Sequence, residues 1–186
     1  MINIKDTVEK YYPKILELGF KTDDTKEKVI ESLERMPKDM LADFQEEELA
    51  SFIFSSITFS DALYMDFEGL EYENLLNNMI KSISGDDLFF EDIHTNISEE
   101  TYEKGEGTGE VSFKCNGQVF SHTIKVLYDW FDMNFIHYLN SDLEQLGIQK
   151  RFILFGDPNG CMLTYKNPDF TEKLKAMFPM FEADVM

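Results

Sequence analysis

The stretch GEVSFKCNGQVFSHTIKVLY, residues 109–128, decides the fold of this chain. Its central Asn116-Gly117 pair is flanked by β-branched and aromatic residues, which is the strongest short-range signal of a β-hairpin with a type I′ turn. A two-residue turn also sets the strand register, so that Val111 should face His122 on the apolar side. The opposite side is mostly polar, and the sequence therefore predicts a half-buried antiparallel hairpin.

The chain on either side of this hairpin is predicted to contain further strands and helices. Residues 88–97 indicate a strand before it, and the apolar pattern over 135–146 indicates a helix after it. The stretch RFILFGDPNGCMLTYK, residues 151–166, predicts a second hairpin around an Asp-Pro-Asn-Gly turn. The Asn-Pro pair at 167–168 then opens a last helix.

The first half of the chain is predicted to be helical. Apolar residues recur at helical spacing over 72–83, and shorter helices are expected over 11–19 and 24–36. A longer helix is expected over 37–53. Residues 54–70 fit neither the helical nor the strand period well, and they are expected to form a helix end followed by irregular structure.

These elements together predict an α+β fold. An antiparallel sheet of about five strands, with two hairpins, would pack against helices, and the N-terminal half would be helical. Hairpin turns outnumber β-α-β crossovers, which disfavours a parallel, doubly wound sheet. The expected organisation is a single domain over 1–186, with a helical subdomain 1–85 and an α+β portion 86–186 as the alternative division.

The composition favours a cytoplasmic globular protein. Hydrophobic residues make up 43% of the sequence, which is enough for a substantial core. No run of about 18 apolar residues predicts a membrane span, and the N-terminus lacks the basic and apolar regions of a secretory signal. Cys115 and Cys161 are far apart and form no disulfide framework, which favours a reducing compartment.

Acidic residues are concentrated in one part of the chain. The formal net charge is −19, and residues 43–110 contain 18 acidic residues but only two basic ones, Lys81 and Lys104. A field of this sign repels DNA, RNA and anionic lipids and attracts cationic proteins. The sequence therefore predicts a basic protein partner, and neither nucleic acid nor membrane. Aromatic residues interleave this acidic band, as they do in tight protein interfaces, namely Phe59, Tyr64, Phe67, Tyr72, Phe89 and Phe90.

One histidine-containing stretch supports a second hypothesis. On a regular strand over 88–97, Asp92 and His94 would share a face and could hold one divalent ion, with His122 as a third ligand if its strand were adjacent. A polar pair on a solvated strand face is the favoured interpretation, because a metal site needs three or more convergent ligands. A metal-dependent hydrolase that uses this region is kept as an alternative function.

Other catalytic patterns are weak. Cys115 and His122 would lie roughly 13 Å apart along the hairpin, which is too far for direct proton transfer. The stretch EKGEGTGE, residues 103–110, matches no phosphate-binding loop, and its glutamates would repel phosphate, so a flexible acidic connection is expected. His137 falls away from the apolar stripe of its helix and should be exposed. No cofactor is expected.

These observations favour a small, acidic, non-catalytic binding protein. The most specific form of this hypothesis is an inhibitor or immunity-type protein that neutralises a basic partner, such as a toxin or a nuclease, with carboxylates in place of phosphates. A scaffold or regulatory subunit is a further alternative, and the oligomeric state stays open. The residues expected to bind the partner are acidic side chains of the band, namely Glu46, Glu47, Glu48, Asp61, Asp66, Glu68, Glu71, Glu73, Asp86, Asp87, Glu91 and Asp92.

Overall fold

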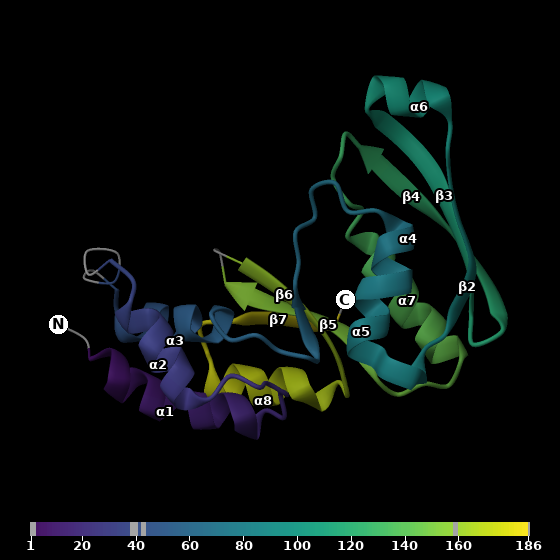
Figure 1. Cartoon of the computed structure of the whole chain (residues 1–186). Helices are drawn as coiled ribbons and strands as arrows, with labels where there is room; N and C mark the ends of the chain where they lie inside the picture. The colour runs from purple at the N-terminus through teal and green to yellow at the C-terminus, as the bar shows by residue number, and fades with distance from the viewer. Residues whose placement is uncertain (1–2, 38–40, 42–43, 158–159, 186) are drawn as a thin grey trace.

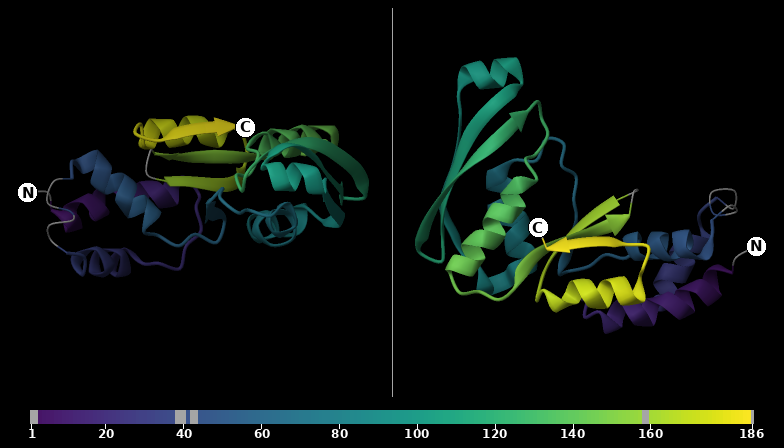
Figure 2. Two further views of the ribbon diagram at one scale, coloured as in Figure 1. Left: turned by 90° about the horizontal axis from the view of Figure 1, so that it is seen from above. Right: turned by 180° about the vertical axis from the view of Figure 1, so that it is seen from behind.

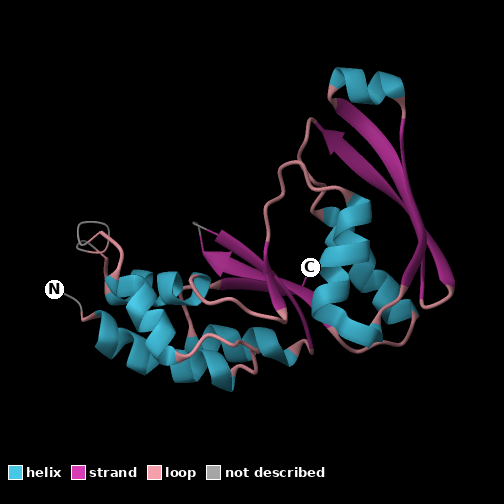
Figure 3. Cartoon of the chain, in the orientation of Figure 1, coloured by secondary structure: helices cyan, strands magenta, loops and turns pink. Residues whose placement is uncertain are grey.

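The structure is a computed structural model that describes residues 3–37, 41, 44–157 and 160–185. It confirms the α+β class: two antiparallel sheets pack with helices, and the N-terminal part is helical (Figure 1, Figure 3). The helical segments are α1 (Ile4–Glu17), α2 (Lys26–Glu34), α3 (Glu46–Ser55), α4 (Tyr72–Asn74), the π-helical η1 (Leu75–Ile80), α5 (Lys81–Ser84), the 3-10 turn η2 (Gly85–Asp87), α6 (Glu99–Lys104), α7 (Asn134–Gln145) and α8 (Asp169–Met177). The strands are β1 (Ala62–Tyr64), β2 (Phe90–Ile97), β3 (Glu106–Cys115), β4 (Gln118–Leu127), β5 (Arg151–Asp157), β6 (Gly160–Lys166) and β7 (Glu182–Val185).

The three-stranded sheet has the order β2-β3-β4 and contains the first predicted hairpin. Strands β3 and β4 pair antiparallel with Val111 opposite His122, as the turn signal predicts. Asn116 and Gly117 have φ angles of 49° and 83°, and positive values at both central positions are the mark of a type I′ turn. The face that carries Val111 is buried in the core. It is called the inner face below, and the opposite face is called the outer face.

Strand β2 departs from the regular alternation that its sequence predicts. Phe90 and Thr95 both pair with inner-face residues of β3, although residues five apart should lie on opposite faces of a regular strand. A β-bulge between Glu91 and His94 adds the extra residue, and Asp92 within it has a φ of 49°. The expectation of a regular strand over 88–97 is therefore wrong from the bulge onward.

The four-stranded sheet has the order β1-β6-β5-β7, and two of its strands were not predicted. Its centre is the second predicted hairpin, β5 and β6, whose turn residues 158–159 lie outside the described residues. Strand β1 falls within 54–70, and β7 follows the last helix. Both are edge strands of three and four residues, too short to show a period of two. Instead of one sheet with about five strands, the described residues form two sheets with seven strands.

Each face of the four-stranded sheet packs into a different hydrophobic core. On one face, Ile153 and Phe155 pack with α1, α2, α3 and α8. On the other face, Phe152 and Leu154 pack with the helix over 72–84, with α7 and with the inner face of the three-stranded sheet (Figure 2). Helix α8 joins the first core and the segment 72–84 joins the second. The cores therefore do not divide the chain at residue 85.

The predicted helices are found, but their ends and regularity differ. The helix over 72–84 is continuous and contains the six-residue π-helical segment η1, and Gly85 ends it with a φ of 60°. The long helix expected from residue 37 is described as a helix only from Glu46. There the carboxylate of Glu48 accepts a hydrogen bond from the N–H of Gln45 in a capping box, which defines the start of α3.

Among the described residues, no helix combines the length and the apolar character that crossing a membrane requires.

Candidate binding groove

A groove of about 440 Å³ is lined by the end of the three-stranded sheet nearest α6, by α6 and by the loop that precedes α4. Figure 1 shows where these elements lie. The inner face of the sheet forms its floor, and two loops form its walls. The groove is lined by Thr95 and Ile97 of β2, by residues 124–126 of β4, by Tyr102 of α6 and by the segments 69–73 and 128–131.

The floor of the groove depends on glycines in strand β3. Gly107 and Gly109 take inner-face positions of this strand, and the side chains of Thr101 and Ile97 lie where their Cβ atoms would stand. A Cβ atom at position 109 would lie 2.7 Å from Cγ1 of Ile97, closer than real side chains approach. Only glycine therefore lets Ile97 lie across the strand. The stretch 103–110, expected to be a flexible connection, is instead the end of α6 and the start of β3.

Backbone hydrogen bonds hold the two loops of the walls together. The N–H of Gly69 donates to the carbonyl oxygen of Asp129 at 2.8 Å, and the N–H of Phe131 donates to the carbonyl oxygen of Phe67 at 2.8 Å. Trp130, the only tryptophan of the chain, lies between these two bonds with 54% of its surface exposed. Its ring is therefore presented to solvent from a backbone that is fixed on both sides.

Two exposed tyrosines line the same groove. Tyr102 and Tyr128 are 77% and 75% exposed. Tyr128 has a φ of 53°, a left-handed conformation that is rare for a bulky residue and costs about 1 kcal/mol. Its N–H donates to the carbonyl oxygen of Gly105 at 2.5 Å, and its ring lies where a Cβ of Gly105 would otherwise stand. The fold thus holds an exposed aromatic ring in a strained position, which is more frequent at functional sites.

The walls of the groove are acidic. Glu71 and Glu73 line one wall and Asp129 lines the other, and all three residues are exposed. Within the described parts of the chain, none of the three forms an ion pair. Lys125 is the basic lining residue, but its pairing opposite Thr108 places its side chain on the outer face. The groove therefore has a negative potential with little internal compensation.

A few of the acidic residues predicted to bind a partner are found at this groove. Glu71 and Glu73 line it, and Glu68 forms an isolated β-bridge with Trp130. The carboxylate of Asp66 accepts a hydrogen bond from the N–H of Glu68 at 3.1 Å. The remaining predicted residues are distributed along the molecule, from α3 at one end to β2 at the other (Figure 1).

Four of the predicted acidic residues form ion pairs within the fold. Asp61 is buried, and its Oδ1 accepts the N–H of Lys21 at 2.9 Å, which gives it a structural role. The ammonium group of Lys114 lowers the pKa of Asp92 through a hydrogen bond and its charge. These four carboxylates would have to leave an internal lysine before they could bind a partner. The pairs are Glu46 with Lys10, Asp61 with Lys166, Asp87 with Lys150 and Asp92 with Lys114.

The exposed aromatic residues of the groove are not the ones that the sequence analysis selected. Of the selected six, Phe59 and Tyr72 are buried, Phe67 and Phe90 are half-buried, and Tyr64 and Phe89 are exposed outside the groove. The local signal that could have indicated the groove is the sequence Leu127-Tyr128-Asp129-Trp130. It places two large aromatic rings beside a carboxylate at the point where an amphipathic strand ends.

The three residues of the metal hypothesis do not converge. His94 pairs with Ser112 on the outer face, whereas His122 lies on the inner face of the same sheet. Asp92 forms its ion pair with Lys114. In the part of the chain that the structure describes, no three His, Cys, Asp or Glu side chains are grouped so that they could hold a metal ion.

His122 lies on the apolar side of its strand, as predicted, and is largely buried. Its Nε2 lies 2.7 Å from Oδ2 of Asp142, which is buried. Its ring stacks on the ring of Tyr138 with 4.9 Å between centroids and 13° between planes. His137 is exposed on α7, also as expected. Cys115 is four positions farther along the hairpin than His122, too far for direct proton transfer between them.

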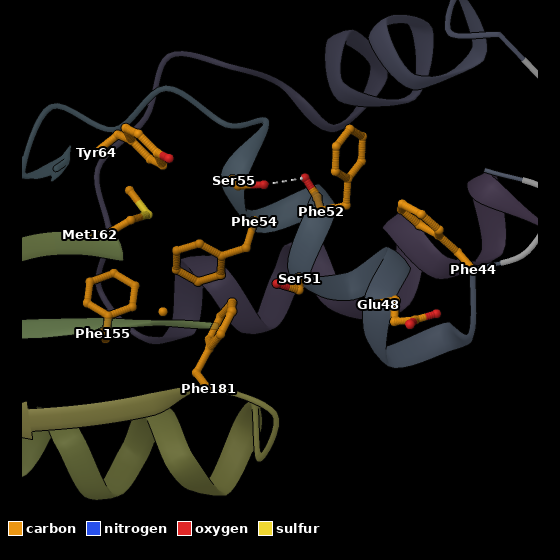
Figure 4. A pocket seen from close by; sticks show the side chains of 11 residues that line it. Phe44, Glu48, Ser51, Phe52, Phe54, Ser55, Tyr64, Phe155, Met162 and Phe181 are labelled. Carbon is orange, nitrogen blue, oxygen red and sulfur yellow. Dashed lines mark hydrogen bonds between the residues drawn. The ribbon is translucent and has the colours of Figure 1, made fainter. Parts of the chain in front are cut away.

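A second hollow, of about 450 Å³, lies between α3 and one end of the four-stranded sheet (Figure 4). Phe54, Phe155 and Phe181 are part of its wall and are almost fully buried. Among the described residues that line it, Glu48 carries the charge, and this carboxylate is engaged in the capping box of α3. The hydroxyl of Ser55 donates to the carbonyl oxygen of Phe52, so the hollow is lined mainly by aromatic rings and by polar groups used within α3.

No protein-family model matches this chain, no curated protein matches it, and no solved structure matches it. Its function is therefore argued from the geometry and charge of the groove.

Proposed function

We propose that this protein is a small, acidic, non-catalytic binding protein that captures a basic protein partner through the groove. The observation that carries the proposal is the meeting of three exposed aromatic rings with three carboxylates that form no ion pair within the described residues. The rings are those of Tyr102, Tyr128 and Trp130.

Each component has a separate role in such an interface. Tryptophan and tyrosine are the residues that most often dominate binding energy, because they bury large apolar surfaces and lose little conformational freedom. The backbone bonds around Trp130 reduce the entropy that binding would otherwise cost. The carboxylates of Glu71, Glu73 and Asp129 attract a cationic partner and orient its approach. The remaining negative charge of the chain adds to this long-range attraction.

The more specific form of the proposal is that the protein is an inhibitor or immunity-type protein. A toxin or nuclease that binds nucleic acid has a cationic cleft that accommodates phosphates. The rigid acidic surface around the groove would cover such a cleft. Its carboxylates would take the positions of phosphates, and its exposed rings would take the positions of bases. This form rests on the charge and shape of the groove and on analogy between classes of protein.

Affinity capture with charge-reversed variants tests the proposal. The immobilised protein is incubated with cell extract, and the bound basic protein is purified and titrated against the wild type, Glu71→Lys/Glu73→Lys and the control Glu17→Lys/Glu34→Lys. The control residues are exposed at the ends of α1 and α2, away from the groove, and change the net charge equally. We expect the groove variant to bind at least about tenfold more weakly, because two attractive pairs become repulsive. Equal binding by the two variants, or a captured protein that is not basic, would refute the proposal.

A further inference from the structure

We infer that the groove recognises one arginine side chain of its partner, whose guanidinium group stacks on the exposed rings and pairs with the carboxylates of the walls. This inference rests on the proposed function and specifies the chemical group that the groove binds.

The aromatic rings of the groove have faces available for a cation. The structure contains many aromatic contacts in its two cores, yet within the described residues no ring–ring contact involves Tyr102, Tyr128 or Trp130, and no lysine or arginine lies over them. One face of Tyr128 lies against Gly105, and the residue as a whole remains 75% exposed. A cation over the face of tryptophan or tyrosine is attracted by the quadrupole of the ring, and tryptophan attracts it most strongly.

Carboxylates line the same groove as the exposed rings. Glu71 and Glu73 belong to one wall, and Asp129 lies between Tyr128 and Trp130 in the sequence of the other. A guanidinium group is planar, offers its N–H donors in the plane and leaves both faces free for stacking. An ammonium group is a compact and strongly hydrated charge that does not stack. A groove that combines exposed ring faces with several carboxylates therefore suits arginine better than lysine.

The floor of the groove suits the aliphatic part of the same side chain. Thr95, Ile97 and Ile124 line it. Arginine buries its methylene groups along apolar surface while its charged end remains in a polar environment. The volume of about 440 Å³ lies toward the low end of the range of ligand sites, roughly 300–1,000 Å³, which fits one long side chain with its flanking backbone.

Intrinsic fluorescence tests the inference directly, because Trp130 is the only tryptophan of the chain and lines the groove. The full-length protein is titrated with three acetylated and amidated tripeptides, Gly-Arg-Gly, Gly-Lys-Gly and Gly-Gln-Gly. We expect a saturable blue shift with the arginine peptide, because stacking removes water from the indole ring. The lysine peptide should bind more weakly, and the glutamine peptide should produce no shift.

Paired variants connect the signal to the walls of the groove. Glu71→Gln/Glu73→Gln should weaken binding of the arginine peptide about fivefold, the factor expected for the loss of two exposed ion pairs. The control Glu17→Gln/Glu34→Gln makes the same change of net charge on α1 and α2 and should bind like the wild type. Circular dichroism establishes that each variant is folded before it is titrated.

The outcomes separate this inference from the proposed function. If the fluorescence does not change saturably, or if the lysine or glutamine peptide binds as well as the arginine peptide, the arginine assignment is wrong. If the arginine assignment fails but capture of a basic partner still depends on Glu71 and Glu73, the proposed function stands. If neither the peptide nor a basic protein depends on Glu71 and Glu73, both proposals fail.

Discussion

Replacing His122 with alanine should destabilise the protein strongly, because the substitution leaves a buried carboxylate without its partner. Asp142 is 1% exposed, and its Oδ2 lies 2.7 Å from Nε2 of His122. Its other oxygen, Oδ1, has no hydrogen-bond partner among the described residues. The carboxylate therefore depends on the imidazole ring for the hydrogen bond that compensates its burial.

The magnitude follows from the two contacts that the substitution removes. Removing one partner of a buried, hydrogen-bonded carboxylate costs about 3–5 kcal/mol, since the carboxyl group then stays buried without a partner. Loss of the stacked contact between His122 and Tyr138 adds about 0.5–1.5 kcal/mol. The expected loss in the free energy of unfolding is therefore about 4–6 kcal/mol. For a chain of this length, such a loss corresponds to a decrease in Tm of roughly 10–20 °C.

Urea unfolding of a double-mutant cycle is the assay. Wild type, His122→Ala, Asp142→Ala and the double variant are unfolded, and the slope of each transition is compared before free energies are extrapolated. The double variant should lose less stability than the sum of the two single variants, because it removes the isolated carboxylate as well. A loss below about 1 kcal/mol in His122→Ala, or strictly additive single variants, would refute the importance of the pair.

Four further predictions concern strand β3 and the second core. Gly109→Val should cost about 1–3 kcal/mol in thermal unfolding, because its Cβ would stand 2.7 Å from Ile97, and an unchanged Tm would contradict the close approach. Tyr165→Phe should stabilise the protein in urea by about 1 kcal/mol, since the buried hydroxyl group has no hydrogen-bond partner among the described residues, and a loss of stability would reveal a missing partner. Burial raises the pKa of Tyr165 to about 12, so the folded state favours the neutral phenol. The stability that this preference adds is complete below about pH 10 and is lost as the pH rises toward 12. This loss of stability at high pH should be smaller in Tyr165→Phe. Burial also raises the pKa of Cys115 to about 11, so a thiol reagent at neutral pH should label Cys115 no faster than the protein unfolds, and rapid labelling of the folded protein would contradict its burial.

The parts of the fold that could be predicted are those whose signal is local. The Asn-Gly turn requires positive φ angles at both positions, so residues 116–117 determine the pairing of Val111 with His122 without information from the rest of the chain. Helical periodicity over 72–83 and over 135–146 identified two helices for the same reason. The bulge in β2 was not predictable, because nothing in its alternating sequence indicates that Asp92 adopts a left-handed conformation.

The candidate site was predictable only in its sign of charge. Summing charges along the chain identified an acidic segment that contains Glu71 and Glu73, but it could not distinguish them from Asp61, whose charge is used in an internal pair with Lys166. The exposure of an aromatic ring is likewise decided by packing. Tyr72 is buried and Tyr128 is exposed, although each has an acidic residue beside it in the sequence, Glu71 before Tyr72 and Asp129 after Tyr128.

The sequence alone determined the α+β class, the first hairpin with its register and the excess of negative charge, because turn chemistry, periodicity and charge each depend on residues that are close in the chain. Only the tertiary structure decided that short strands β1 and β7 form, since such strands exist through the partners that they pair with. It also decided where the groove lies. Tyr102, Trp130 and Glu71 come from three separate segments, and only the packing of those segments at one end of the three-stranded sheet brings them to one place.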